Sequence, residues 1–337
     1  LGYDGSGVIW SITDTGVDYD HPDLGPRIVG GHNYAGCVFP NPGDDPASGG
    51  HGTHVAGIVS GDASGGHVDG DGFYYGLGMA PDSGIFAQNP VCGTQAAWPP
   101  AGGWQELSKQ GLLGGAIGAN NSWTSGEGIA HGYQSTERTH DFMVRDGNFD
   151  TPDVAEPYIT VFSAGNWGPL PQSLTAPKEA KNVIVTASTQ NYRASGDIDA
   201  LSSFSSRGPA VDGRYVPTIA APGEEIASTR NDQGGIDCFV PIPGTGDLYA
   251  FCSGTSMAAP HASGSVVLIA DWWRDNNDGA DPSPAMAKAL LINGAVDISG
   301  ASPIPNFDEG WGRINLSNVI DNGQAMIYHD QDHLVTA

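Results

Sequence analysis

The chain has 337 residues, of which 38 are acidic and 13 are Lys or Arg, so its formal net charge is −25. This charge repels nucleic-acid backbones and anionic lipid, and no apolar run approaches the roughly 20 residues that span a bilayer, so we expect neither partner. Hydrophobic residues make up 39% of the chain, and its 50 Gly follow no Gly-X-Y period, which excludes a collagen-like chain and indicates a buried core.

Short apolar strands and helices are predicted to alternate along the chain. In chain order, strands are expected at 8–12, 85–87, 115–122, 158–162, 183–187 and 218–221, and helices at 51–59, 129–145, 256–273 and 284–292. Several of these strands are continuous β-branched runs, which are typical of parallel strands buried on both faces. The helix at 256–273 is apolar nearly all round, as a buried central helix is. The alternation predicts an α/β fold with a mostly parallel sheet, as a single domain over 1–337.

Three segments place reactive side chains at the ends of predicted elements. Asp14 follows the first strand, His51 opens a helix, and Ser256 begins the central helix. Cleavage of a peptide bond by serine needs a hydroxyl that attacks, an imidazole that moves its proton, and a carboxylate that holds the imidazole. The helix N-terminus adds a positive dipole end where negative charge develops. Taken alone, each of these residues is more typical of a cap, a turn or the surface.

The three segments together resemble the signature blocks of the subtilisin-like serine proteases. They are Asp-Thr-Gly-Val-Asp at 14–18, His-Gly-Thr-His-Val-Ala-Gly at 51–57 and Gly-Thr-Ser-Met-Ala-Ala-Pro-His at 254–261, in the family's order. The resemblance implies a three-layer α/β fold whose mostly parallel central sheet has helices on both faces. It also implies a catalytic triad, and the place of each residue in its block favours Asp14, His51 and Ser256 over Asp18, His54 and Ser253.

A fourth block, Phe-Ser-Ala-Gly-Asn at 162–166, ends the fourth of the predicted strands with an amide side chain. The matching Asn of the family donates a hydrogen bond to the oxyanion, so the resemblance assigns that role to Asn166, with the Ser256 N–H as second donor. The alternative is that Asn166 only closes a turn before 167–169.

The resemblance also implies where the substrate side chain is received. The segment 120–124 lies where the family has the strand that pairs with the substrate, so one wall of the first specificity pocket is expected at Ser122, Trp123 and Thr124. The other wall is expected at Ser163, Ala164 and Gly165. Small residues suggest a tolerant pocket that accepts apolar side chains, although Thr124 narrows it where the family usually has Gly. Trp123 fits a position in the core equally well.

Further phrases resemble the larger secreted bacterial alkaline proteases that carry a β-sandwich domain after the catalytic one. They are Asn-Ser-Trp at 121–123, Ser-Ala-Gly-Asn-Trp-Gly-Pro at 163–169, Ser-Phe-Ser-Ser-Arg-Gly-Pro at 203–209 and Gly-Trp-Gly-Arg-Ile-Asn at 310–315. From this resemblance we expect a secreted monomer, matured from a precursor whose propeptide aids folding and inhibits the enzyme. We also expect a missing C-terminal β domain, protein or peptide substrates, and no cofactor for catalysis.

Two acidic turns are candidates for structural calcium, which the family often binds. They lie at 67–72, with Asp69 and Asp71, and at 275–281, with Asp275 and Asp278. Calcium takes six to eight oxygen ligands, and neither turn matches the full EF-hand loop. The alternative is an acidic, solvated turn.

The four cysteines stand at 37, 92, 238 and 252 and form no Cys-X-X-Cys motif, so a zinc ribbon or a thioredoxin site is not expected. The short loop between Cys238 and Cys252 suits a local disulfide, and Cys37–Cys92 then follows by elimination. The alternative is four buried free thiols.

We therefore predict a secreted serine endopeptidase of broad specificity that acts through an acyl-enzyme at neutral to alkaline pH, where the imidazole of His51 is uncharged. A peptide macrocyclase would share the acyl-enzyme but would need inserted shielding helices, and no long helical insertion is evident. An inert calcium-binding module is disfavoured by the intact Asp14, His51, Asn166 and Ser256. The acid-active relatives carry Glu in place of this His.

Overall fold

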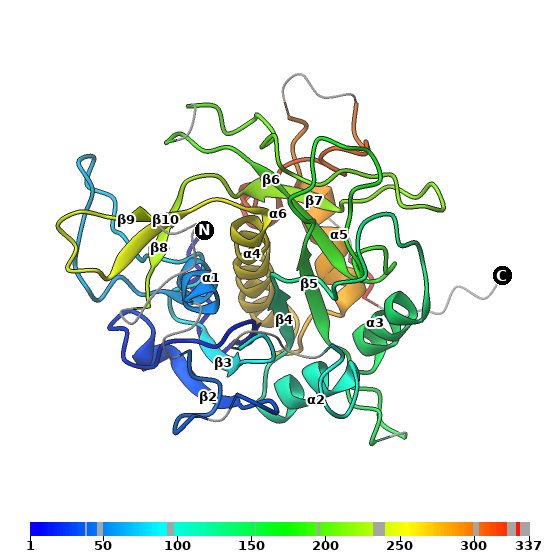
Figure 1. Ribbon diagram of the computed structural model, residues 1–337, viewed down its shortest axis with the longest axis horizontal. Coiled ribbons are helices and arrows are strands. Elements are labelled where there is room, and N and C mark those ends of the chain that lie inside the picture. The colour runs from blue at the N-terminus through cyan, green and yellow to red at the C-terminus, as the bar shows by residue number, and fades with distance from the viewer. Residues whose placement is uncertain are drawn as a thin grey trace.

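Seven parallel strands, several of them continuous apolar runs, form a sheet at the centre of the molecule (Figure 1). The computed structural model describes residues 1–37, 39–45, 50–92, 98–151, 153–193, 196–231, 240–298, 303–321 and 328–330. The strand order is β2-β3-β1-β4-β5-β6-β7. The strands are β1 (Ile9–Thr13), β2 (Ile28–His32), β3 (Gly84–Gln88), β4 (Gly118–Asn121), β5 (Ile159–Ser163), β6 (Ile184–Thr189) and β7 (Ile219–Pro222).

The helices lie on both faces of this sheet, because alternate side chains of each buried strand point to opposite faces. On β5, Ile159 and Val161 join the core formed with helices α1 (His51–Ser60), α4 (Thr255–Asn276) and α5 (Pro284–Gly294). The neighbouring Phe162 joins a second core with α2 (Gln105–Leu113) and α3 (Ser135–Arg145). The expected three-layer α/β fold is therefore confirmed.

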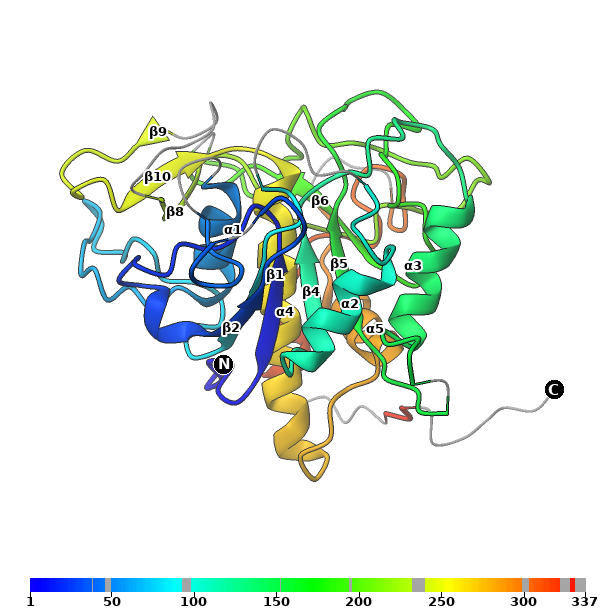
Figure 2. The same cartoon turned by 60° about the horizontal axis from the view of Figure 1, so that its bottom comes forward.

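Helix α4 runs through the middle of the molecule (Figure 2) and is buried almost all round, as its apolar sequence predicts. Two further short helices are η1 (Gly25–Arg27) and α6 (Ser317–Ile320). A small antiparallel sheet lies beside α1 in the order β8-β10-β9, formed by β8 (Ile226–Thr229), β9 (Val240–Pro241) and β10 (Tyr249–Cys252). Within the residues described, no helix combines the length and the apolar character that a membrane span requires.

The helix predicted from residue 129 is wrong at its start, since α3 begins at Ser135. Ala130 and Gly132 both have positive φ, which a helix excludes. A capping box then starts the helix, in which the Gln134 N–H donates to Glu137 Oε2 at 2.8 Å. Strand β2 and helix α2 were not predicted, because their segments carry glycine or polar residues where a periodic apolar pattern would be needed. The small antiparallel sheet was not predicted either, because its strands are only two to four residues long.

Parallel pairing brings the carboxyl ends of β1, β4 and β5 together. Ile12 pairs with Asn120, and Asn121 pairs with Phe162. The residues that follow these strands therefore meet at one edge of the sheet, where α1 and α4 also begin.

Candidate active site

Asp14 stands immediately after β1 and is buried, with 2% of its surface exposed. Its backbone N–H donates to the Gln88 carbonyl at 3.0 Å, which continues the pairing with β3. Its Oδ1 accepts from the Thr15 N–H at 2.8 Å and bonds His51 Nδ1 at 2.7 Å. The carboxylate is thus held by its own loop and aimed at the first residue of α1.

Helix α1 can approach Asp14 only because Gly52 follows His51. A Cβ at Gly52 would lie 2.1 Å from the Gly16 carbonyl oxygen and 3.0 Å from the Asp14 Cβ, so any larger residue would push the helix away. The Gly52 N–H donates to Thr15 Oγ1 at 2.9 Å, which ties the helix start to the same loop. The glycine in this block therefore sets the distance between imidazole and carboxylate.

The electrostatics of His51 follow from this pair. Burial opposes protonation, but the Asp14 carboxylate, through its charge and its hydrogen bond, and the charge of Asp45 outweigh burial and raise the pKa of His51 above its ordinary value. With Nδ1 bonded to a carboxylate, the neutral ring carries its proton on Nδ1 and leaves Nε2 as an acceptor. This is the tautomer that a general base requires.

Ser256 is the second residue of α4, where the backbone N–H has no acceptor within the helix. Its Oγ donates to the Ser122 carbonyl at 3.3 Å, and Ser122 Oγ donates to the Ser256 carbonyl at 2.9 Å. These two bonds tie the end of β4 to the start of α4. In the described residues, Ser256 Oγ makes no hydrogen bond to His51, so the Asp–His link is formed and the His–Ser link is open.

Asn166 lies in the exposed loop after β5 and is bonded to the residue before the serine. Its Oδ1 accepts from the Thr255 N–H at 2.9 Å and from Thr255 Oγ1 at 2.8 Å. Both partners are donors, so the oxygen must face α4 and the Nδ2 group is left to donate elsewhere. Gly165, with φ +110°, makes the turn that brings the amide there, and its N–H bonds Thr255 Oγ1 at 3.0 Å.

A cavity of about 180 Å³ opens beside Ser256. It contains five of the six residues predicted to form the first pocket, while Ala164 is fully buried and does not line it. The structure adds four residues to which the sequence analysis assigned no role: Trp167, Thr175, Lys178 and Thr255. The lining residues are Ser122, Trp123, Thr124, Ser163, Gly165, Asn166, Trp167, Thr175, Lys178, Thr255 and Ser256.

The two alternatives for Trp123 are both realised. It lines the cavity, yet only 8% of its surface is exposed. Its ring stacks on Trp98 at 4.4 Å between centroids and lies parallel to Trp104 at 5.9 Å. One wall of the cavity is therefore the edge of an aromatic core.

The three residues that were alternatives to the expected triad, Asp18, His54 and Ser253, form hydrogen bonds elsewhere. Ser253 Oγ accepts from the Glu225 N–H at 2.8 Å, Asp18 Oδ1 accepts from the Asp20 N–H at 2.9 Å, and His54 Nε2 bonds the Ala250 carbonyl at 3.1 Å. Burial lowers the pKa of His54 to about 3, so this imidazole stays neutral. These contacts belong to the turns and to the packing of α1 on the small sheet.

Asp45 is a buried carboxyl group near the site that no sequence pattern indicated. Its Oδ2 accepts from Thr53 Oγ1 at 3.0 Å and from Thr15 Oγ1 at 3.1 Å. Burial raises its pKa to about 7 against the effect of these hydrogen bonds. Asp45 thus joins the loop after β1 to helix α1, and its charge reaches His51.

The aspartates expected to bind calcium are not grouped into a metal site in the structure. Asp69 accepts the N–H groups of Asp71 and Phe73 and pairs with Arg193, so its oxygens are already engaged. Asp275 is exposed in the last turn of α4, and Asp278 is exposed just after that helix. Among the residues that the structure describes, no three His, Cys, Asp or Glu side chains are grouped to hold a metal ion. Calcium binding at these turns stays a prediction.

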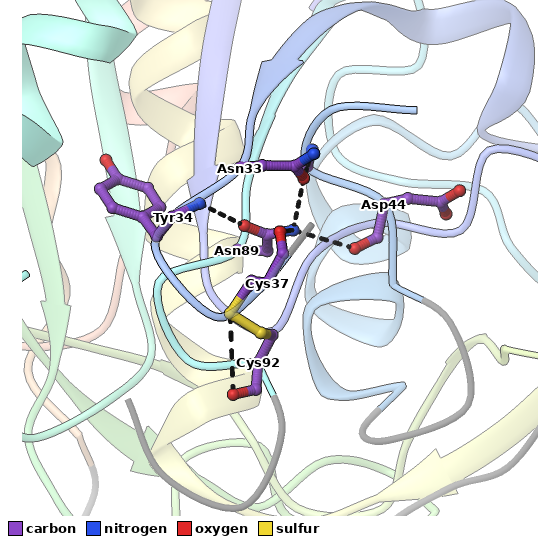
Figure 3. The surroundings of a disulfide bond; sticks show 7 residues. Asn33, Tyr34, Cys37, Asp44, Asn89 and Cys92 are labelled. Atoms are coloured by element: carbon purple, nitrogen blue, oxygen red, sulfur yellow. Dashed lines mark hydrogen bonds between the residues drawn. A yellow bond between two sulfur atoms is a disulfide. The ribbon is translucent and has the colours of Figure 1, made fainter. Parts of the chain in front are cut away.

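The disulfide between Cys37 and Cys92 is present, with its Cα atoms 5.8 Å apart (Figure 3). Beside it, Asn89 accepts from the Tyr34 N–H at 3.0 Å and donates to Asn33 Oδ1 at 2.9 Å. The bond and the amide together hold the 33–45 segment against the end of β3. Cys238 lies outside the described residues, so the local disulfide with Cys252 stays a prediction.

Comparison with known proteins agrees with this geometry. Residues 5–312 match the model of the subtilase family. Serine protease AprX of Bacillus subtilis is 33% identical over 329 residues, covering 94% of this chain and 66% of the relative. Thermitase of Thermoactinomyces vulgaris is 30% identical over 315 residues, covering 88% of this chain and 84% of thermitase. The chain spans 66% of AprX and 62% of the thermophilic serine proteinase of a Bacillus species, so it is shorter than several of its relatives.

Solved structures show the same architecture. Fervidolysin of Fervidobacterium pennivorans, described as a keratinolytic enzyme related to subtilisin, superimposes with a TM-score of 0.70 at 26% identity, covering 95% of this chain and 43% of fervidolysin. Sphericase superimposes with a TM-score of 0.65 at 24% identity over 93% of both chains, which shows the fold alone. On the family match and these relatives, the chain belongs to the subtilase family of serine proteases.

Proposed function

We propose that this chain is the catalytic domain of a serine endopeptidase, with Asp14, His51 and Ser256 as its triad. The observation that carries the proposal is the 2.7 Å bond between the buried Asp14 carboxylate and His51 Nδ1, at the sheet edge where Ser256 begins α4 beside a cavity. A carboxylate, an imidazole and a hydroxyl in this chain order and at one sheet edge suit acyl transfer.

In the proposed mechanism, Ser256 Oγ attacks the carbonyl carbon of the substrate and its proton passes to His51 Nε2. Asp14 stabilises the imidazolium that forms. The Nδ2 group of Asn166 and the Ser256 N–H donate to the oxyanion. His51 then gives the proton to the leaving amine, and a water molecule, deprotonated by His51, hydrolyses the acyl-enzyme. The absence of a hydrogen bond between His51 and Ser256 Oγ in the described residues is compatible with this order of steps, because catalytic hydrogen bonds are often long before substrate binds.

The proposal covers residues 1–337 as one catalytic domain that acts on protein or peptide substrates. Support comes from the family match over residues 5–312 and from the cavity that adjoins the serine. A secreted enzyme is favoured by the Cys37–Cys92 disulfide, because such bonds persist in oxidising compartments. A propeptide, a C-terminal β domain, a monomeric state and structural calcium stay predictions.

The first test is labelling with a fluorophosphonate probe, followed by peptide mapping by mass spectrometry, with Ser256→Ala as the matched control. We expect one adduct, on Ser256, which the Ser256→Ala variant lacks. Absence of an adduct on folded protein would contradict the proposal and favour a non-catalytic module. A macrocyclase would label equally, so the products of a long peptide are analysed in parallel: linear fragments support hydrolysis, and cyclic products oppose it.

A further inference from the structure

The cavity beside Ser256 contains a buried lysine. Lys178 lines it together with Ser256 and Asn166, and only 2% of its surface is exposed. Its Nζ donates to Thr175 Oγ1, another lining residue, at 2.5 Å. All the other lining residues are neutral, so this ammonium is the charged group of the described lining.

Lys178 has no acidic partner in the described part of the chain: no carboxylate there lies within salt-bridge distance of its Nζ. The carboxylate of the adjacent Glu179 is engaged elsewhere, because it accepts the N–H groups of Gly132 at 3.3 Å and Val211 at 2.8 Å. An ammonium has three N–H donors, and the Thr175 hydroxyl takes one of them. Burial without a counter-charge accordingly lowers the pKa of Lys178 to about 7.

The backbone turn that carries Lys178 is tied to the wall opposite. Thr124 Oγ1 and Ser125 Oγ donate to the Ala176 carbonyl at 3.2 Å and 3.1 Å, and the Ser125 N–H adds a third bond at 3.1 Å. The Lys178 N–H closes the turn onto the Thr175 carbonyl at 3.1 Å. A side chain carried on a backbone fixed in this way is positioned before the ligand binds, which favours selectivity.

We propose that Lys178 makes this cavity select substrates with an acidic side chain, Asp or Glu, at the residue whose carbonyl Ser256 attacks. The inference rests on the proposed function and sharpens it from broad specificity to a substrate class. A substrate carboxylate that enters the cavity supplies the negative charge that Lys178 lacks among the described residues. It forms charge-assisted hydrogen bonds with the ammonium. A neutral side chain of the same shape supplies no counter-charge and leaves the buried amine with the Thr175 hydroxyl alone, which is the less favourable arrangement.

The net charge of −25 opposes acidic substrates at long range, but ions screen it beyond about 8–10 Å in physiological salt, whereas the buried contact is little screened. Local pairing therefore decides the preference.

The experiment compares kcat/KM for peptides that differ only at the residue before the cleaved bond, as Glu, Gln, Leu and Lys. For the natural chain we expect Glu to exceed Gln by roughly 10²-fold or more, with Lys poorest. In Lys178→Met, which keeps the length and loses the charge, the Glu-to-Gln ratio falls to about one while cleavage after Leu is kept or improved. Lys181→Met, at an exposed lysine outside the cavity, keeps the natural ratio.

Equal cleavage after Glu and Gln by the natural chain would overturn the inference, and this measurement needs no variant. A Glu-to-Gln ratio that survives in Lys178→Met would overturn it as well. Fluorophosphonate labelling of Ser256 in each preparation separates the two proposals: labelled enzyme that prefers neutral residues refutes the acidic preference alone, and unlabelled, inactive protein refutes the proposed function.

Discussion

Two basic side chains, the half-buried His51 and the buried Lys178, have opposite electrostatic surroundings. His51 bonds the Asp14 carboxylate at 2.7 Å, and its pKa is raised. Lys178 bonds only the Thr175 hydroxyl among the described residues, and its pKa is lowered to about 7. In the proposed mechanism His51 gains and loses a proton in every turnover, and its counter-charge is the Asp14 carboxylate of the enzyme itself. In the proposed specificity, Lys178 obtains its counter-charge from the substrate, so its burial makes the cavity selective.

Replacing Ser256 has the largest expected effect. Ser256→Ala should lower kcat by about 10⁶-fold, the loss known for subtilisin itself when its nucleophile is removed, because no acyl-enzyme forms. Binding of a Glu-containing peptide should persist, since Asp14–His51 and Lys178 are untouched. Steady-state kinetics and calorimetric titration measure the two quantities, and kcat within tenfold of the natural value contradicts the role of Ser256.

Breaking the pair formed by Asp14 and His51 is expected to lower kcat somewhat less. Asp14→Asn should lower kcat by roughly 10⁴-fold, because an amide no longer stabilises the imidazolium and permits the wrong tautomer. Asp18→Asn is the matched control, because Asp18 lies in the same block but bonds the Asp20 N–H, and this variant should lose far less activity. Comparable losses in the two variants, measured as kcat/KM on one peptide, would refute the choice of Asp14.

The proposed role of Asn166 as oxyanion donor can be tested with little change of side-chain shape. Asn166→Asp keeps an oxygen that accepts from Thr255 N–H and Oγ1, but it replaces the Nδ2 donor with negative charge. Loss of one such donor lowers kcat by about 10²–10³-fold in subtilisin, and we expect at least this loss with KM little changed. A mainly higher KM would show that Asn166 acts in substrate binding, and the melting temperature controls for folding.

The smallest expected effect concerns pH. The neutral His51 is the active form, so activity is lost as pH falls through its pKa, which lies above the ordinary value of about 6.5. Asp45→Asn removes a charge that raises this pKa, so the acid limb of kcat/KM should move to lower pH. If the acid limb of kcat/KM stays unchanged or moves to higher pH, the charge of Asp45 does not raise the pKa of His51.

The same variant should also change stability in a pH-dependent way. The pKa of Asp45 is raised from 3.8 to about 7 in the fold, so between these values the unfolded chain is ionised while the folded carboxyl group keeps its proton, and stability falls progressively until pH is above 7. The melting temperature of Asp45→Asn relative to the natural chain should therefore be higher at pH 9 than at pH 5. This comparison uses the same protein preparations as the kinetic profile.

Local patterns predicted much of this molecule. The continuous run at 158–162 became β5, displaced by one residue, and the helix predicted at 256–273 became α4. These elements depend on residues close together in the chain, whose periodicity is visible in the sequence. Helix α3 shows the limit, because two residues of positive φ interrupt a segment whose composition suits a helix.

The α/β fold class and the blocks that contain Asp14, His51, Asn166 and Ser256 could be predicted from local patterns, because strand periodicity, glycine turns and helix starts are local properties. The surroundings of these residues depend on contacts between distant parts of the chain. Lys178 belongs to no motif, and it lines the cavity because the Ala176 carbonyl bonds Thr124, 52 residues away in the chain. Burial and charge pairing arise from such distant contacts, so the character of a pocket appears only once the chain has folded.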